Sequence, residues 1–326
     1  MTSPSSLTSQ IAYRLHKAPL EGSLALIFPG QGSQHVGMGA NLYRESAAAQ
    51  EVFREAEAIL GSELSRLCFQ GPEEELRQTA NAQPAIMVTS LACLAAALES
   101  GAISQRPAFV AGHSLGEYTS LVAAGALTFE DALRLVSRRG QLMQEAGQAQ
   151  PGTMAALLGF SEAQIDEICH LSGAEPCNYN SPGQIVVGGA PAAVAKAAAL
   201  AKERNGRAIP LSVSGAFHTS LMKAAAGEFA QAVQETPLSD AVIPVVGNVS
   251  ARPMTSADEV RADLTQQLTS PVLWHQSVTT MLQAGVRTFI EVGPGRVLSS
   301  LLKRAAPEAR AVSIDGSTPP SNLSNV

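Results

Sequence analysis

The sequence has few charged residues, few aromatic residues and no dense cluster of basic ones. Charged residues make up 15% of its 326 residues and hydrophobic residues 45%, whereas an ordinary soluble domain has roughly 25% charged residues. Much of the chain should therefore lie in an interior, and its length suits one large domain or a domain with a subdomain. The net charge of −6 argues against nucleic acid as the main partner.

The sequence also lacks cysteine motifs and long apolar runs. Its four cysteines are scattered without the CxxC spacing of metal or redox sites, so we expect no metal and a reducing, cytoplasmic compartment. The longest apolar stretch, within residues 85–100, is interrupted by Thr89 and Ser90 and is shorter than the ~20 residues of a bilayer crossing. It predicts a buried helix and no membrane span. Residues 1–22 and 313–326 are predicted to be disordered tails.

Three buried strands are each followed at once by a turn and a helix. They lie at residues 24–28, within 106–112 and at the start of 288–304. Strands that alternate with helices predict a largely parallel sheet, which holds ligands at the carboxyl ends of its strands. Gln31, Ser114 and the turn at 293–295 should therefore meet at one edge. The glycine loop at 29–32 lacks the spacing of a phosphate-binding loop.

The middle of the chain has a different order of elements. Residues 150–214 predict strand, helix, strand, strand, helix and strand, which is the ferredoxin-like arrangement. The predicted fold is therefore α/β, with a large α/β-hydrolase-like subdomain at 23–149 and 215–312. Its mostly parallel sheet is interrupted in sequence by an inserted ferredoxin-like (βαββαβ) subdomain.

Ser114 stands in the sequence Gly112-His113-Ser114-Leu115-Gly116, between a predicted strand and a predicted helix. This is the nucleophile-elbow pattern, in which the glycines make room for a sharp turn that exposes the hydroxyl. The helix that begins near Leu115 directs free backbone N–H groups at a developing oxyanion. The competing interpretation is that Ser114 merely caps this helix, but the strand and helix on either side favour catalysis.

A serine nucleophile needs a base, and histidine is the common choice. The chain has six histidines. His218 follows the last strand of the predicted subdomain, at a domain junction where clefts often form. His35, after the glycine loop, stays open as an alternative. Any of these histidines could instead be a hydrogen-bonded structural side chain.

Arg139 is the residue that most narrows the substrate. In the helix predicted around it, Arg139 shares one stripe with Ala132, Val136 and Met143, while the polar residues take the opposite stripe. A buried guanidinium stays charged and needs an anion. That anion could be an internal carboxylate, with Glu117 and Glu291 as candidates, or it could belong to a ligand.

Eight motifs, spread over about residues 24–304, give the chain a resemblance to a known family, the malonyl-CoA:acyl-carrier-protein transacylases. The resemblance implies that Ser114 is the acylated nucleophile and His218 its base. It further implies that Gln31 and Leu115 supply the N–H groups of the oxyanion hole, and that Arg139 binds the malonyl carboxylate. The motifs are FPGQGSQ, NAQPA, GHSLGEY, SRRGQLM, NSPGQIVVGG, FHTSLM, SPVLWHQSV and EVGPGRVL.

The resemblance also implies a ping-pong transfer of malonyl from malonyl-CoA to the phosphopantetheine thiol of acyl carrier protein, in fatty-acid or polyketide synthesis. It implies no cofactor beyond the coenzyme A thioester substrate, and a monomer. Gln267 matches the position whose backbone carbonyl orients the histidine. Phe217 resembles the Ala-Phe-His signature of malonyl-selective enzymes, where a bulky ring disfavours a methyl branch. Gly247 departs from the family pattern, in which many members have Asn.

Two other functions fit parts of the pattern. A serine ester hydrolase shares the elbow, but a neutral ester gives the inward Arg139 no partner. An acyltransferase-like scaffold that only binds a carrier protein would not need Ser114, His218 and Arg139 together. The inward Arg139 thus favours a substrate with a free carboxylate, and the resemblance implies that this substrate is a thioester and that the enzyme is a transferase.

Overall fold

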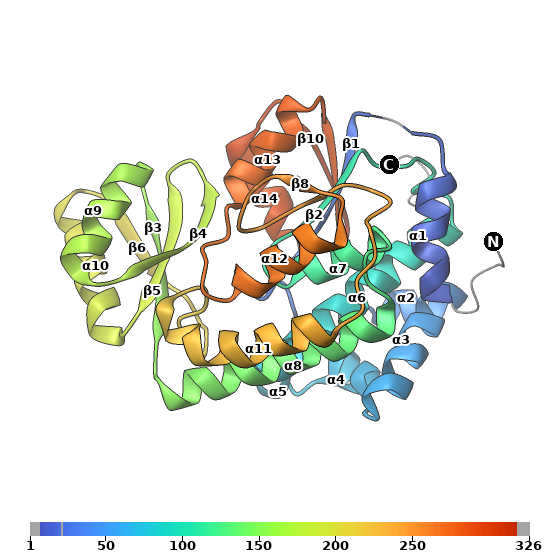
Figure 1. The fold of residues 1–326 in the computed structure, drawn as a ribbon, viewed down its shortest axis with the longest axis horizontal. Coiled ribbons are helices and arrows are strands. Elements are labelled where there is room, and N and C mark those ends of the chain that lie inside the picture. The colour runs from blue at the N-terminus through green and yellow to red at the C-terminus, as the bar shows by residue number, and fades with distance from the viewer. Residues whose placement is uncertain (1–6, 21, 318–326) are drawn as a thin grey trace.

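The computed structural model describes residues 7–20 and 22–317, which form a large unit and a small unit (Figure 1). The large unit is built on a six-stranded sheet of order β10–β9–β1–β2–β7–β8. Neighbouring strands are parallel except for the short pair β7 and β8. The strands are β1 (Leu24–Phe28), β2 (Phe109–Gly112), β7 (Val245–Val246), β8 (Pro253–Met254), β9 (Thr288–Val292) and β10 (Arg310–Ile314).

Helices cover both faces of this sheet. In β1 the side chains of Leu26 and Phe28 belong to the larger core, whereas Ala25 and Ile27 face a second core made with α13 and α14. The helices of the large unit are α1 (Leu7–Lys17), α2 (Ala40–Glu45), α3 (Ala47–Leu60), α4 (Leu64–Gln70), α5 (Glu73–Arg77), α6 (Thr79–Glu99), α7 (Gly116–Ala123), α8 (Phe129–Ala149), η1 (Ser220–Met222), α11 (Lys223–Glu235), α12 (Ala257–Gln267), α13 (Trp274–Gln283) and α14 (Val297–Ala305).

Helix α6 is the buried helix that the apolar stretch predicts. It is long and apolar enough to cross a membrane by length and composition, but 89% of its most apolar window is buried inside the protein. It packs against α3 and α8. Its apolar residues therefore belong to the core of the large unit.

The small unit is the predicted ferredoxin-like subdomain. Its antiparallel sheet has the order β4–β5–β3–β6, and two helices accompany it. A parallel bridge between Asn178 and Val272 joins its β4 to the segment before α13. The elements are β3 (Thr153–Leu158), α9 (Glu162–Ser172), β4 (Glu175–Ser181), β5 (Gln184–Gly189), α10 (Pro191–Glu203) and β6 (Arg207–Pro210), which project to one side of the large unit in Figure 1.

The three predicted buried strands are β9, β1 and β2, and they are neighbours in the sheet. Phe28 pairs with Gly112 and Ile27 with Glu291, so these strands end at about the same level. The loops that carry Gln31, Ser114 and residues 293–295 therefore leave from one edge, as the sequence predicts.

The predicted tails are wrong where the structure describes them. Residues 7–17 form helix α1, in which Ile11 and Leu15 are buried. These two residues lie one turn apart, and the serine-rich composition of the segment hid that spacing. Residues 313 and 314 end strand β10, and Asp315 pairs with Arg296. The rest of the predicted tails, at 1–6, 21 and 318–326, lies outside the described residues.

Candidate active site

Ser114 lies on a turn that only glycine neighbours permit. Its φ angle is 51°, in the left-handed region that a side chain rarely adopts. A Cβ at Gly116 would lie 2.1 Å from the carbonyl oxygen of Phe28, and a Cβ at Gly112 would lie 1.9 Å from Gly116. Both glycines are therefore needed to press the start of α7 against the sheet edge and to project the Ser114 hydroxyl outward.

Asn248 holds this turn from the loop after β7. Its Oδ1 accepts a hydrogen bond of 2.7 Å from the backbone N–H of Ser114. Its Nδ2 donates a bond of 2.7 Å to the carbonyl oxygen of Gly112. The side chain is buried, so these two bonds fix the turn from below.

His218 is the histidine that reaches Ser114. Its Nε2 lies 2.7 Å from Ser114 Oγ, and its Nδ1 lies 2.8 Å from the carbonyl oxygen of Gln267. Because a carbonyl can only accept, Nδ1 carries the proton and Nε2 keeps a lone pair for the Ser114 hydroxyl. Burial, and next the charge of Arg139, lower the pKa of His218 to about 3. The imidazole is therefore neutral near pH 7 and can accept a proton.

Arg139 reaches the same hydroxyl from helix α8. Its Nη2 donates to Ser114 Oγ at 3.0 Å and to Gln267 Oε1 at 2.9 Å, and its Nη1 donates to Gln83 Oε1 at 2.8 Å. The guanidinium also lies 5.4 Å from the centre of the Tyr118 ring. Among the described residues no carboxylate pairs with Arg139. Its charge is held by neutral groups and stays available to an anion.

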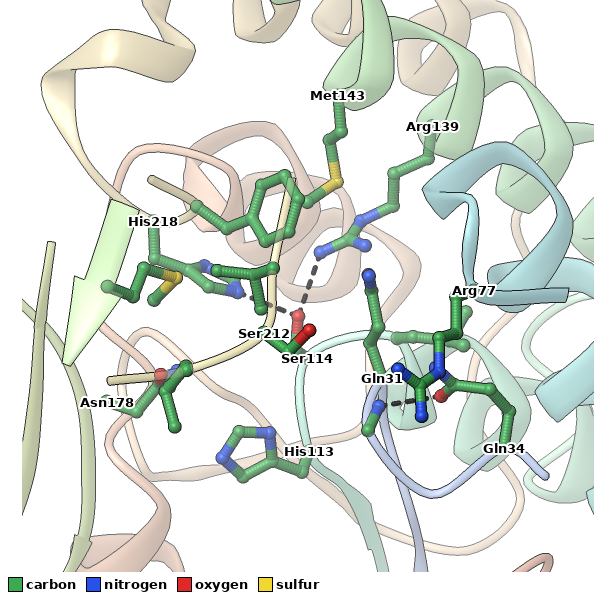
Figure 2. A pocket seen from close by; sticks show the side chains of 16 residues that line it. Gln31, Gln34, Arg77, His113, Ser114, Arg139, Met143, Asn178, Ser212 and His218 are labelled. Atoms are coloured by element: carbon green, nitrogen blue, oxygen red, sulfur yellow. Dashed lines mark hydrogen bonds between the residues drawn. The ribbon is translucent and has the colours of Figure 1, made fainter. Parts of the chain in front are cut away.

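A cavity of about 360 Å³ opens above Ser114 between the two units. Figure 2 shows Arg139 and His218 converging on the Ser114 hydroxyl, with Gln31 on the side of Ser114 away from His218. Gln31, Leu115 and Phe217 also line the cavity. In the described part of the chain, the backbone N–H groups of Gln31 and Leu115 donate to no protein group. These two donors can therefore face a ligand oxygen.

Three other titratable side chains have partners other than Ser114 and Arg139. His35 contacts the carbonyl oxygen of Ser33, and His113, although it lines the cavity, places Nε2 2.8 Å from Asn180 Oδ1. Glu291 accepts two backbone N–H groups of α14. Neither Glu291 nor Glu117 forms the internal ion pair with Arg139 that the sequence left open.

No group of three or more histidine, cysteine, aspartate or glutamate side chains within residues 7–20 and 22–317 is arranged to hold a metal ion. The groups that converge here are a hydroxyl, an imidazole, a guanidinium and free backbone N–H donors. This set can perform nucleophilic acyl transfer.

Comparisons with known proteins match almost the whole chain. Residues 25–319 match the family model of the acyl transferase domain. The malonyl CoA-acyl carrier protein transacylase of Bacillus subtilis is 45% identical over 297 residues, which are 89% of this chain and 93% of the relative. The chain belongs to the malonyl-CoA:acyl-carrier-protein transacylase family.

Solved transacylase structures have the same fold. The structure from Xanthomonas oryzae has a TM-score of 0.88 at 42% identity, covering 93% of this chain and 98% of that one. A malonyl-transacylase in complex with a type II polyketide-synthase acyl-carrier protein has a TM-score of 0.87 at 38% identity, covering 93% and 98% of the two chains. The α/β fold with a mostly parallel sheet and a separate antiparallel sheet is thus the fold of this family.

Three side chains of the transacylase site have no assigned role in the sequence analysis. Gln83 belongs to the NAQPA motif, and its distance from Arg139 along the chain does not predict the hydrogen bond between the two side chains. Asn248 follows Gly247, whose departure from the family pattern was the only signal in that loop. Glu117 was weighed only as a partner of Arg139, whereas it accepts from Asn248 and Gln267.

Proposed function

We propose that this acyltransferase moves the malonyl group of malonyl-CoA to the phosphopantetheine thiol of acyl carrier protein through a malonyl ester of Ser114. One observation carries the proposal. The Ser114 hydroxyl lies within hydrogen-bond distance of a neutral histidine, at 2.7 Å, and of a guanidinium, at 3.0 Å, that pairs with no carboxylate of the described residues. A nucleophile beside an uncompensated cation suits an acyl group that ends in an anion.

Acylation begins when His218 Nε2 takes the Ser114 proton and Oγ attacks the thioester carbon. The negative charge that develops on the carbonyl oxygen is stabilised by the N–H groups of Gln31 and Leu115. When the C–S bond breaks, the coenzyme A thiolate takes the proton from His218. The products are the Ser114 ester and free coenzyme A.

Transfer to the carrier protein reverses these steps. The phosphopantetheine thiol gives its proton to His218 and attacks the ester carbon, so that a C–S bond forms and the bond to Ser114 Oγ breaks. Ser114 regains its proton from His218. Because coenzyme A leaves before the carrier thiol attacks the Ser114 ester, the cycle is ping-pong. The carbonyl oxygen of Gln267 keeps the His218 ring in the tautomer that the cycle needs.

Arg139 holds the free carboxylate of the malonyl group through both half-reactions. A guanidinium has five N–H donors. Gln83, Gln267 and Ser114 take three of them, while Nε–H is buried without a partner among the described residues. One Nη1–H and the Nε–H therefore remain. Because they lie on different edges of the guanidinium, a carboxylate held at two points takes one of them together with an Nη2–H, in place of Ser114 or Gln267.

Phe217 adds a preference for malonyl over methylmalonyl. Its ring is buried and lines the cavity just before His218 in the chain. A methyl branch on the acyl α-carbon would crowd this ring, and one methyl group is worth about 1–3 kcal/mol. We place the reaction in fatty-acid or polyketide synthesis, and we expect a cytoplasmic monomer.

The proposal is tested by a brief incubation with malonyl-CoA, followed by intact mass measurement. The protein is expected to gain one malonyl group on Ser114 and to lose it when a phosphopantetheine thiol is added. Ser114→Ala should show no adduct and lose activity by about 10³-fold or more. A native chain that stays unmodified would refute the transfer, and an adduct released only to water would indicate a hydrolase.

A further inference from the structure

Glu117 is a fully buried carboxyl group directly beneath the Ser114 turn. It lies in the first turn of α7 and accepts hydrogen bonds at both of its oxygens. Oε1 accepts from the backbone N–H of Asn248 at 3.1 Å, and Oε2 accepts from Nε2 of Gln267. The reaction proposed above gives Glu117 no chemical role, although both of its partners touch Ser114.

The side-chain amide of Gln267 connects Glu117 to the reacting groups. Its Nε2 donates to Glu117 and, at 3.0 Å, to the carbonyl oxygen of Ser114. Its Oε1 accepts from Arg139 at 2.9 Å. An amide has one donor end and one acceptor end. Glu117 and the Ser114 carbonyl oxygen therefore both hold the NH2 end of the Gln267 amide, so that its oxygen faces the guanidinium.

Asp263, on α12, is a second buried carboxyl group beside Glu117. Its Oδ1 accepts from the backbone N–H of Val249, the residue after Asn248, while no N–H or O–H group of residues 7–20 and 22–317 is placed as a donor to its buried Oδ2. A proton held by Glu117 supplies that donor. Burial, and next the charge of Asp263, raise the pKa of Glu117 well above its ordinary value. Two buried carboxyl groups in contact share one proton because they cannot both ionise at low cost.

Gly247 provides the space for this arrangement. A Cβ at position 247 would lie 2.5 Å from Oδ1 of Asp263, so a side chain there would require the Asp263 carboxylate to move. The glycine at position 247 therefore leaves room for the Asp263 carboxylate in the place where it lies.

We propose that Glu117, supported by Asp263, is a positioning residue that fixes the direction of the Gln267 amide and thereby the places of Arg139 and Ser114. The inference rests on the proposed function only in taking Ser114 as the nucleophile. It names Glu117 as a residue that acts through Gln267 and touches neither substrate nor the reacting atoms.

Glu117→Gln breaks this chain of contacts without changing its size. An amide at 117 cannot accept at both ends, so its NH2 group meets either the Asn248 N–H or the Gln267 NH2 group. The backbone donor cannot turn, and the Gln267 amide can. If Gln267 rotates, its NH2 group then faces the guanidinium of Arg139, and the mismatch reaches Ser114.

The test is a double-mutant cycle of Glu117→Gln and Gln267→Met. Methionine removes the amide and keeps the backbone carbonyl that holds His218. The rates are those of malonyl transfer and of Ser114 labelling by a fluorophosphonate, in which a Ser114 Oγ–P bond forms, fluoride leaves and His218 takes the proton. As a single substitution, Glu117→Gln should slow both rates by about 100-fold. This is the loss of rate expected when a reacting group is misplaced.

In the Gln267→Met background the same change should alter both rates by less than about threefold, because no amide remains to rotate. A full loss in both backgrounds, or no loss in the native chain, overturns the inference. If the Glu117→Gln single variant does not fold, the Gln267→Met single variant is compared with the double variant, and the two are expected to have equal rates. Unequal rates for these two would equally overturn it.

Glu291→Gln is the matched control, since Glu291 is also fully buried and accepts two N–H groups, away from Ser114. It should leave the labelling rate of folded protein unchanged. Labelling also separates the two proposals. A native chain that is labelled but transfers no malonyl contradicts the proposed function, while the labelling rates still decide the role of Glu117.

Discussion

Two strand–turn–helix units leave the same edge of the large sheet, one on either side of β1, and they treat their helix N-termini in opposite ways. In the unit of β9 and α14, Glu291 accepts from the N–H groups of Leu298 at 2.9 Å and Ser299 at 2.7 Å. The arginine at its turn, Arg296, pairs with Asp315 at 3.1 Å. This unit satisfies its helix donors and its cation with the protein's own carboxylates.

In the unit of β2 and α7, neither the helix donor nor the cation is satisfied by a carboxylate of the described residues. The N–H group of Leu115 donates to no protein acceptor in the described structure, and the buried cation above it, Arg139, is held by amides and a hydroxyl. Unmet donors and an unpaired buried charge cost folding free energy. Of these two units, the one that bears this cost is therefore the one whose turn lines the cavity, where a ligand can satisfy the donors and the charge.

Arg139→Ala should have the largest effect on activity, because it removes the buried charge that distinguishes the unit of β2 and α7. Truncating one side of a buried ion pair costs about 2–5 kcal/mol, which is roughly 30- to 5,000-fold in kcat/KM for malonyl-CoA. Acetyl-CoA has no carboxylate, so its use should rise relative to that of malonyl-CoA. The measurement is kcat/KM for both thioesters. Equal losses for the two would mean that Arg139 serves only the structure.

The same variant should change the pH dependence of Ser114 labelling. The charge of Arg139 is the second cause, after burial, that lowers the pKa of His218. Labelling needs neutral His218, so its rate falls as the pH drops through that pKa. Without Arg139 the pKa rises, and the fall should begin at higher pH than in the native chain. An unshifted acid limb would contradict this account of the His218 pKa.

Asn248→Ala should have the next largest effect, since it releases the Ser114 turn from below. The backbone N–H of Ser114 and the carbonyl of Gly112 both lose their partner. We expect Ser114 labelling to slow by about 100-fold. The control is Asn81→Ala, which removes one bond to the carbonyl of Glu75 and should leave the rate unchanged. Equal rates in native and Asn248→Ala protein would show that the turn holds its shape without Asn248.

Glu291→Gln should have the smallest effect on activity and should act on stability. An amide leaves one of the two α14 donors without an acceptor, at a cost of about 1–3 kcal/mol. A lower free energy of unfolding, measured by denaturant titration, with unchanged labelling of the folded protein is the expected result. Slower labelling would mean that the unit of β9 and α14 also supports the unit of β2 and α7, which carries Ser114.

Much of the fold follows from patterns that are local in the sequence. The buried strands next to glycine turns predict the parallel sheet, and the order of elements over 150–214 predicts the small antiparallel unit. The inward place of Arg139 follows from its helical stripe. Helix α1 was missed because its two buried residues are spaced among serines and polar side chains. Its stability comes from packing against the rest of the large unit, which the local sequence does not reveal.

The sequence by itself determined the Ser114 turn and the buried face of α8, because turn sterics and helical periodicity depend on residues within a few positions of each other. Only the tertiary structure decided what surrounds Ser114. His218 lies 104 positions from Ser114 and the Gln267 amide 153, and the direction of that amide depends on Glu117. Hydrogen bonds between such distant residues form only after packing brings the donors and acceptors together, and no spacing in the chain encodes them.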